Sequence, residues 1–147
     1  MQAKDRIILA LDVDSEAEAL GFVGQLAPFV GAFKVGMQLF NSTGPSIVNK
    51  INELGGRVFV DLKFHDIPNT VAAAGRVMTR LNCHMFNVHA AGGRVMLENV
   101  ASSERRSQSP GPNISYYPGS YSANQHRPVR AGKRNVNIRA PGRRSSS

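Results

Sequence analysis

Residues 58–71 read VFVDLKFHDIPNTV. An apolar run leads directly into two carboxylates, Asp61 and Asp66, on either side of the Lys63 ammonium. In an extended segment, residues two apart share a face, so Asp61 and Lys63 are expected to point the same way at the end of a strand. Pro68 then suits the first turn of a helix. The stretch therefore predicts a strand, a charged loop and a helix in succession.

This charge arrangement has two interpretations. Two flanking carboxylates keep Lys63 protonated, which makes it a poor nucleophile and a well-placed proton donor. The alternative is an ordinary ion pair at the surface end of a strand, because surface charge clusters outnumber catalytic motifs. The motif alone leaves both interpretations open.

Short apolar runs alternate with helical periodicity through the first hundred residues. Ser15 is expected to cap the first helix, with Glu18 at the capping-box position, and Gly55-Gly56 is expected to end the second. Four βα units in a row predict a parallel sheet with right-handed crossovers. The expected strands are residues 6–11, 32–37, 57–63 and 84–89, and the expected helices are residues 15–26, 46–54, 68–81 and 93–100.

The composition changes abruptly near residue 100. Residues 1–100 hold nine Lys and Arg against nine Asp and Glu, whereas residues 101–147 hold nine Lys and Arg against the single acid Glu104. The net charge of +8 therefore lies in this tail, which contains no Leu, Met or Phe. Such a segment buries too little apolar area to offset chain ordering, so residues 101–147 are expected to be disordered. Tyr116-Tyr117 and Val136-Asn137-Ile138 are too short to predict strands.

Other features narrow the class of protein. The single cysteine, Cys83, cannot form an internal disulfide and is expected to be a small buried residue. The N-terminus does not resemble a signal peptide, and no apolar stretch approaches the roughly 20 residues of a membrane span. These features predict a soluble, cytoplasmic protein.

Residues 61–71 closely resemble the signature of the bacterial-type orotidine 5'-phosphate decarboxylases. The similarity extends to LALD at 9–12, FKVG at 33–36 and NVHA at 87–90, and it covers about residues 5–100. It implies an α/β fold in which residues 1–100 form the N-terminal half of a (β/α)8 TIM barrel, with four βα units. A complete barrel takes about 200 to 250 residues. We therefore expect a partial barrel followed by an unrelated tail at 101–147, in which inward-facing Leu9, Val35 and Phe59 lack partners across the barrel axis.

A shift of reading frame near codon 100 explains the change of composition better than a fusion does. Translation of the two other frames beyond that codon tests this hypothesis. If neither frame restores strand-like apolar sequence, the hypothesis is wrong.

The resemblance implies decarboxylation of orotidine 5'-monophosphate to uridine 5'-monophosphate in pyrimidine biosynthesis, with neither a metal nor an organic cofactor. Lys63 would donate a proton to the carbon that loses carbon dioxide, and Asp61 would lie against the departing carboxylate. Lys34 would bond the ribose hydroxyls and the charged network, and Asp12 would contact the sugar. All four are expected at the C-terminal ends of strands, where barrel enzymes hold their sites.

The resemblance also implies a homodimer with shared active sites. Asp66, Ile67 and Thr70 match family positions that reach into the neighbouring subunit's site. The late loops that hold the substrate phosphate in the family have no counterpart in this sequence, so weak or absent activity is expected. The expected catalytic residues are Lys63, Asp61, Asp66 and Lys34, and the expected substrate-binding residues are Asp12, Lys34, Asp61, Lys63, Asp66, Ile67 and Thr70.

Two alternative functions are compatible with parts of the sequence. Sugar-phosphate decarboxylases and synthases of the same barrel superfamily share the D-x-K-x-x-D motif, but they bind magnesium through an acidic residue where this chain has Lys34. The arginine-rich tail, with its interspersed tyrosines, resembles a disordered nucleic-acid binder. Adventitious binding of polyanions is the preferred explanation for such a tail, so nucleic acid is not expected as a partner.

Overall fold

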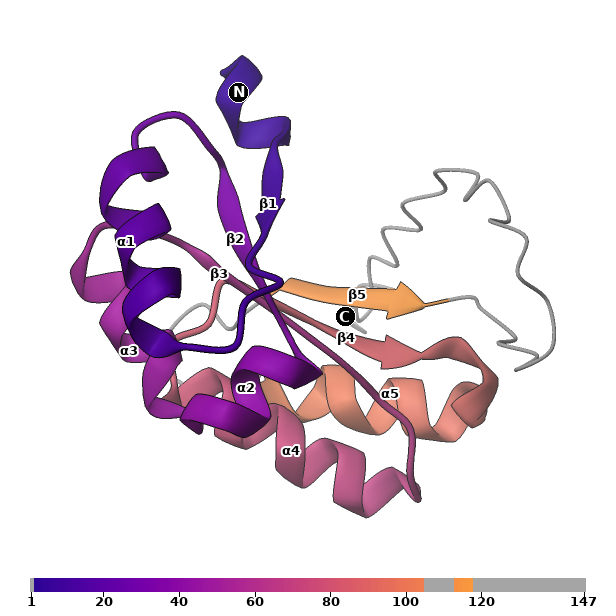
Figure 1. Cartoon of the computed structure of the whole chain (residues 1–147). Coiled ribbons are helices and arrows are strands. Elements are labelled where there is room, and N and C mark those ends of the chain that lie inside the picture. The colour runs from indigo at the N-terminus through magenta and orange to yellow at the C-terminus, as the bar shows by residue number, and fades with distance from the viewer. Residues whose placement is uncertain (1, 105–112, 118–147) are drawn as a thin grey trace, which may run out of the picture.

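A parallel sheet organises the structure, a computed structural model that describes residues 2–104 and 113–117 (Figure 1). The strands lie in the order in which they occur along the chain, and each runs parallel to the next. This is the order with which a (β/α)8 barrel begins. The strands are β1 (Ile8–Ala10), β2 (Ala32–Gly36), β3 (Val58–Phe64), β4 (Met85–His89) and β5 (Asn113–Tyr117).

Helices follow the first four strands and cover one face of the sheet (Figure 1). The four predicted βα units are therefore confirmed, and the short α2 is an addition that sequence periodicity did not predict. The helical segments are η1 (Ala3–Arg6), α1 (Glu16–Leu26), α2 (Met37–Thr43), α3 (Ser46–Glu53), α4 (Pro68–Arg80), η2 (Ala90–Gly92) and α5 (Gly93–Glu104). Within residues 2–104 and 113–117, no helix combines the length and hydropathy that a membrane span requires.

Local sequence signals fix the starts of two helices. The Ser15 hydroxyl accepts a hydrogen bond from the Glu18 amide at 3.2 Å, which satisfies one of the free donors of the first turn of α1. Pro68 occupies the first position of α4, where its missing amide costs nothing. Both helices begin where the sequence predicted.

The core lies between the sheet and the helices. Val35 is fully buried in it, and Leu9 packs against the same apolar cluster. Phe59 alternates with the buried Val58 and Val60, so it lies on the opposite face of the sheet. The expectation that Leu9 and Val35 face the barrel axis with Phe59 was therefore wrong, because the pleat turns them toward the helices.

The strand β5 was not predicted from the sequence. It pairs in parallel with β4 from Met85 opposite Asn113 to His89 opposite Tyr117, and Ile114 packs against the apolar cluster. A short polar segment can form a strand here because the edge of β4 supplies hydrogen-bond partners. The expectation that no strand follows Val100 was wrong, and the rest of the tail, residues 105–112 and 118–147, lies outside the described residues.

Candidate active site

Four charged side chains of alternating sign meet at the C-terminal ends of β1, β2 and β3. Lys34 Nζ lies 3.3 Å from Asp12 Oδ1 and 3.6 Å from Asp61 Oδ2. Lys63 Nζ donates to Asp61 Oδ1 at 2.7 Å. Asp61 is the most enclosed of the four, with 14% of its side chain exposed, whereas Asp12 is 70% exposed. The structure therefore brings these four predicted residues together.

The strand β3 is irregular where it carries Asp61 and Lys63. Val60 pairs with Phe86 and Phe64 pairs with Val88, so residues 61–63 lie opposite the single residue Asn87 of β4. Lys63 has a φ of 52°, in the left-handed region that side chains other than glycine rarely adopt. Bulges of this kind reorient side chains next to active sites. Asp61 and Lys63 therefore meet through a bulge, and not through the simple alternation that the sequence suggested.

Asn87 joins the two residues from the neighbouring strand. Its Oδ1 accepts from the Lys63 amide at 2.7 Å, and its Nδ2 donates to Asp61 Oδ1 at 2.6 Å. Asn87 is 4% exposed and sits between the fully buried Phe86 and Val88. Asn87 was not among the predicted site residues, although an amide in the middle of an apolar strand is a signal that could have identified it.

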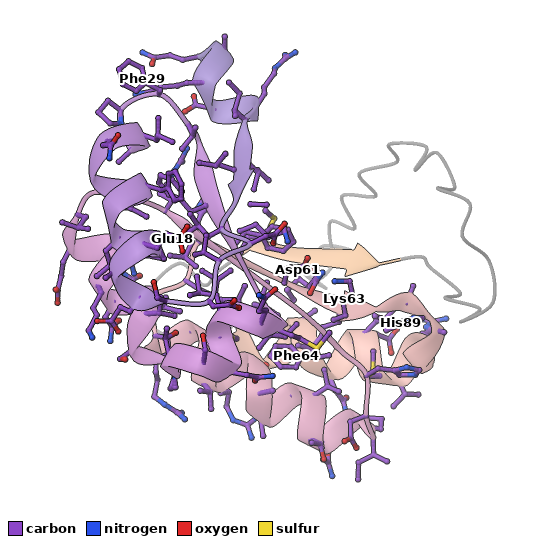
Figure 2. The ribbon with its side chains drawn as sticks, viewed as in Figure 1. Glu18, Phe29, Asp61, Lys63, Phe64 and His89 are labelled. Carbon is purple, nitrogen blue, oxygen red and sulfur yellow. The ribbon has the colours of Figure 1, made fainter. Side chains whose placement is uncertain are left out.

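Competing effects set the charge of Asp61. Burial raises the pKa of its carboxyl. Hydrogen bonds from Lys63 and Asn87, with the positive charges of Lys63 and Lys34, more than offset burial, so the pKa lies below the ordinary 3.8. Asp61 is therefore a carboxylate at neutral pH and a fixed negative charge between the Lys34 and Lys63 ammonium groups. Figure 2 shows Asp61 next to Lys63.

The remaining predicted residues lie in the loop after β3 and in the first turn of α4. Asp66 Oδ1 accepts from the Ile67 amide at 2.6 Å, and the Ile67 side chain is 67% exposed. A pocket of about 430 Å³ is lined by Lys63, Asp66 and Thr70, among others. A second pocket of about 540 Å³ is lined by Asp66 and Ile67 together with Ala91 and Gly92. Asp66, Ile67 and Thr70 thus border open space beside the charged cluster.

Two histidines flank this loop. The rings of His65 and His89 stack with centroids 4.7 Å apart, and His89 Nδ1 accepts from the Ala91 amide at 3.2 Å. These contacts order the ends of β3 and β4 beside the site.

The charged cluster is suited to electrostatic and proton-transfer chemistry. Two ammonium groups restrain the Asp61 carboxylate, so it can stay in place beside a second negative charge, and Lys63 can supply a proton to a neighbouring atom. No redox or nucleophilic side chain is needed for such a reaction.

Comparisons with known proteins agree with this geometry. The model of the orotidine 5'-phosphate decarboxylase / HUMPS family matches residues 5–118, which include β5. The orotidine 5'-phosphate decarboxylase of Syntrophomonas wolfei is 78% identical over 100 residues, which are 68% of this chain and 42% of the relative. That of Moorella thermoacetica is 54% identical over 105 residues, which are 71% of this chain and 42% of the relative.

Solved structures show the same similarity. The orotidine 5'-phosphate decarboxylase of Lactobacillus acidophilus superposes with a TM-score of 0.67 at 30% identity, over 75% of this chain and 51% of that one. The orotidine 5'-monophosphate decarboxylase of Methanocaldococcus jannaschii, solved with the inhibitor BMP, superposes with a TM-score of 0.63 at 32% identity, over 68% of this chain and 47% of that one. The neighbours are TIM barrels, so the predicted partial barrel is confirmed.

This chain spans less than half the length of the curated relatives that it matches. The matched part nevertheless contains the charged cluster and all five strands. The chain belongs to the orotidine 5'-phosphate decarboxylase / HUMPS family.

Proposed function

We propose that this chain carries part of an orotidine 5'-monophosphate decarboxylase site, which forms uridine 5'-monophosphate and carbon dioxide. The observation that carries the proposal is the alternating cluster of Asp12, Lys34, Asp61 and Lys63 at the strand ends. We further propose that the complete protein acts in the cytoplasm as a homodimer, with Asp66, Ile67 and Thr70 facing the partner's site. All three residues are exposed, Asp66 and Ile67 in the loop after β3 and Thr70 in the first turn of α4, which supports that part of the proposal.

In the proposed reaction, the bond between the pyrimidine ring and its carboxylate breaks, and the electron pair stays on the ring carbon. Asp61 lies against the carboxylate and disfavours its localised charge relative to the transition state, where that charge is spread. The Lys63 ammonium then donates its proton to the ring carbon and recovers one from solvent. Lys34 and Asp12 hold the ribose hydroxyls. No step requires a metal or an organic cofactor.

The position of Lys34 argues against the sugar-phosphate alternative. Its ammonium lies between the carboxylates of Asp12 and Asp61, where a magnesium site would need an acidic ligand. The nucleic-acid alternative rests on the arginine-rich tail, most of which lies outside the described residues.

The test compares this chain with a hybrid in which the remainder of the Syntrophomonas wolfei relative completes the barrel. We expect the hybrid to decarboxylate orotidine 5'-monophosphate and Lys63→Ala to slow it at least about 100-fold. Lys50→Ala, which removes a lysine from α3 that pairs with Glu16, is the matched control and should retain the activity.

The 147-residue chain alone should show no turnover above its own Lys63→Ala variant. Contacts to the distant phosphate supply binding energy that such catalysis uses, and the family draws those contacts from late loops. An inactive hybrid would contradict the proposed function. Turnover by the 147-residue chain that depends on Lys63 would show that the late loops are dispensable.

A further inference from the structure

The buried side-chain amide of Asn87 forms hydrogen bonds with two residues of the charged cluster. It is 4% exposed, and a buried amide is costly unless its donor and acceptor are both used. Ser103, the other buried polar residue in the described part of the chain, donates to the Val100 carbonyl of its own helix. Asn87 instead contacts two residues of the neighbouring strand, and both belong to the bulge.

The two contacts of Asn87 act on different properties of the site. Its carbonyl oxygen accepts from the Lys63 amide at 2.7 Å, in the residue whose φ is 52°. Its amide nitrogen donates at 2.6 Å to Asp61 Oδ1, the oxygen that also accepts from Lys63 Nζ at 2.7 Å. The first contact restrains a backbone that is otherwise strained, and the second fixes one carboxylate oxygen from two directions.

We propose that Asn87 is a positioning residue of this site, which holds Lys63 in its left-handed conformation and orients the Asp61 carboxylate against the Lys63 ammonium. The catalytic consequence rests on the proposed function, whereas the positioning itself rests on the contacts. Asn87 would act through Asp61 and Lys63, the two residues that its side-chain amide contacts.

The chemistry of the amide explains why asparagine suits this position. The Lys63 amide is a donor and needs an acceptor, whereas the Asp61 carboxylate is an acceptor and needs a donor. Asparagine offers one of each on a short planar group. Aspartate would keep the acceptor for Lys63 but would place a second carboxylate beside Asp61, and alanine would satisfy neither partner.

The contrast between alanine and aspartate at position 87 separates the contact with Lys63 from the contact with Asp61 in one experiment on the 147-residue chain. Isotope-labelled protein is titrated by NMR to measure the pKa of the Asp61 carboxyl, and backbone chemical shifts report the conformation of Lys63. In Asn87→Ala we expect the pKa of Asp61 to rise and the left-handed shifts of Lys63 to be lost. In Asn87→Asp we expect the pKa of Asp61 to rise further, because a like charge is added, while Lys63 keeps its left-handed shifts.

Ser103→Ala is the matched control, since it removes the other buried polar group and should leave both readouts unchanged. If Asn87→Ala does not fold, the pKa of Asp61 in Asn87→Asp decides the outcome. Neither readout depends on turnover, so an inactive protein would not affect the test. The inference is overturned if the folded variants keep the pKa of Asp61 and the conformation of Lys63 and lose only global stability.

Discussion

At the scale of single residues, the site combines a strained backbone with a fixed charge. Lys63 adopts a φ of 52° in the bulge of β3, and its ammonium meets the Asp61 carboxylate at 2.7 Å. A left-handed conformation costs a residue with a side chain about 1–3 kcal/mol unless its surroundings compensate. The left-handed backbone of Lys63 therefore accompanies the placement of its ammonium beside Asp61.

Lys63→Gly should be more stable than Lys63→Ala by about 1 kcal/mol, because glycine adopts a positive φ without steric cost. Both changes remove the same ammonium, so their difference isolates the backbone. At Lys50, inside α3, the order should reverse, with glycine less stable than alanine by about 1 kcal/mol. Urea unfolding of the four variants measures both differences. Equal stability of the two variants at position 63 would show that the backbone there is unstrained.

Asp61 should make folding stability depend on acidity. Its folded pKa lies below the ordinary 3.8, so its contribution is fully present above that pH and is lost as the pH falls through the folded pKa. Asp61→Asn should therefore flatten the curve of unfolding free energy against pH below about pH 4. Urea unfolding at a series of acidic pH values gives the curve. An unchanged slope in the variant would mean that other carboxyls dominate acid unfolding.

At the scale of elements, β5 shows how a strand can form without an apolar run of its own. It spans Asn113–Tyr117, with the sequence NISYY, and it pairs with β4 along its whole length. Ile114 is partly buried against the cluster formed by the sheet and helices. The Ile114 side chain and the backbone pairing with β4 both contribute to holding it in place.

Shortening Ile114 should loosen this strand. Ile114→Ala should lower the free energy of unfolding by about 2 kcal/mol, and the conservative Ile114→Val by less than about 1 kcal/mol. Amide hydrogen exchange in β4 should quicken in the alanine variant, because β5 covers one edge of β4. If exchange in β4 and the unfolding free energy both stay unchanged, β5 contributes nothing to the stability of the sheet.

At the scale of the whole molecule, the sheet has one face covered by helices and one face that carries the charged cluster. In the described residues, β1 and β5 each pair along one edge only. Ile8 on β1 is 45% exposed and Met37, just after β2, is 56% exposed. Unpaired edges and exposed apolar side chains favour association between chains.

We therefore expect the 147-residue chain to self-associate as its concentration rises. Sedimentation velocity over a range of concentrations should show this, and Ile8→Lys should weaken it by placing a charge on the edge strand. Val95→Lys is the control, because Val95 is also exposed, at 62%, but lies on α5 on the helical side. A dilute, monodisperse monomer that unfolds cooperatively and stays monomeric on concentration would refute the expectation.

The sequence by itself determined the four βα units and the residues of the charged cluster. Strand alternation, the Ser15 cap and Pro68 act over a few residues, so they can be read locally. Because parallel strands bring their carboxyl ends to one edge of the sheet, the charges that follow successive strands had to meet there. Asp61 and Lys63 were predictable from the charged motif itself, whereas Asp12 and Lys34 were selected through the resemblance to the decarboxylase family.

Only the tertiary structure decided the face that Leu9 and Val35 occupy, the pairing of β5 and the contacts of Asn87. Each of these depends on residues distant in the chain: helices that cover one side, an open edge on β4, and a bulge in β3 opposite a single residue. The left-handed conformation of Lys63 is of the same kind, because local preference opposes it and a neighbouring strand supplies the hydrogen bond that compensates. Periodicity and capping carry no information about such partners, since they are set by register between strands.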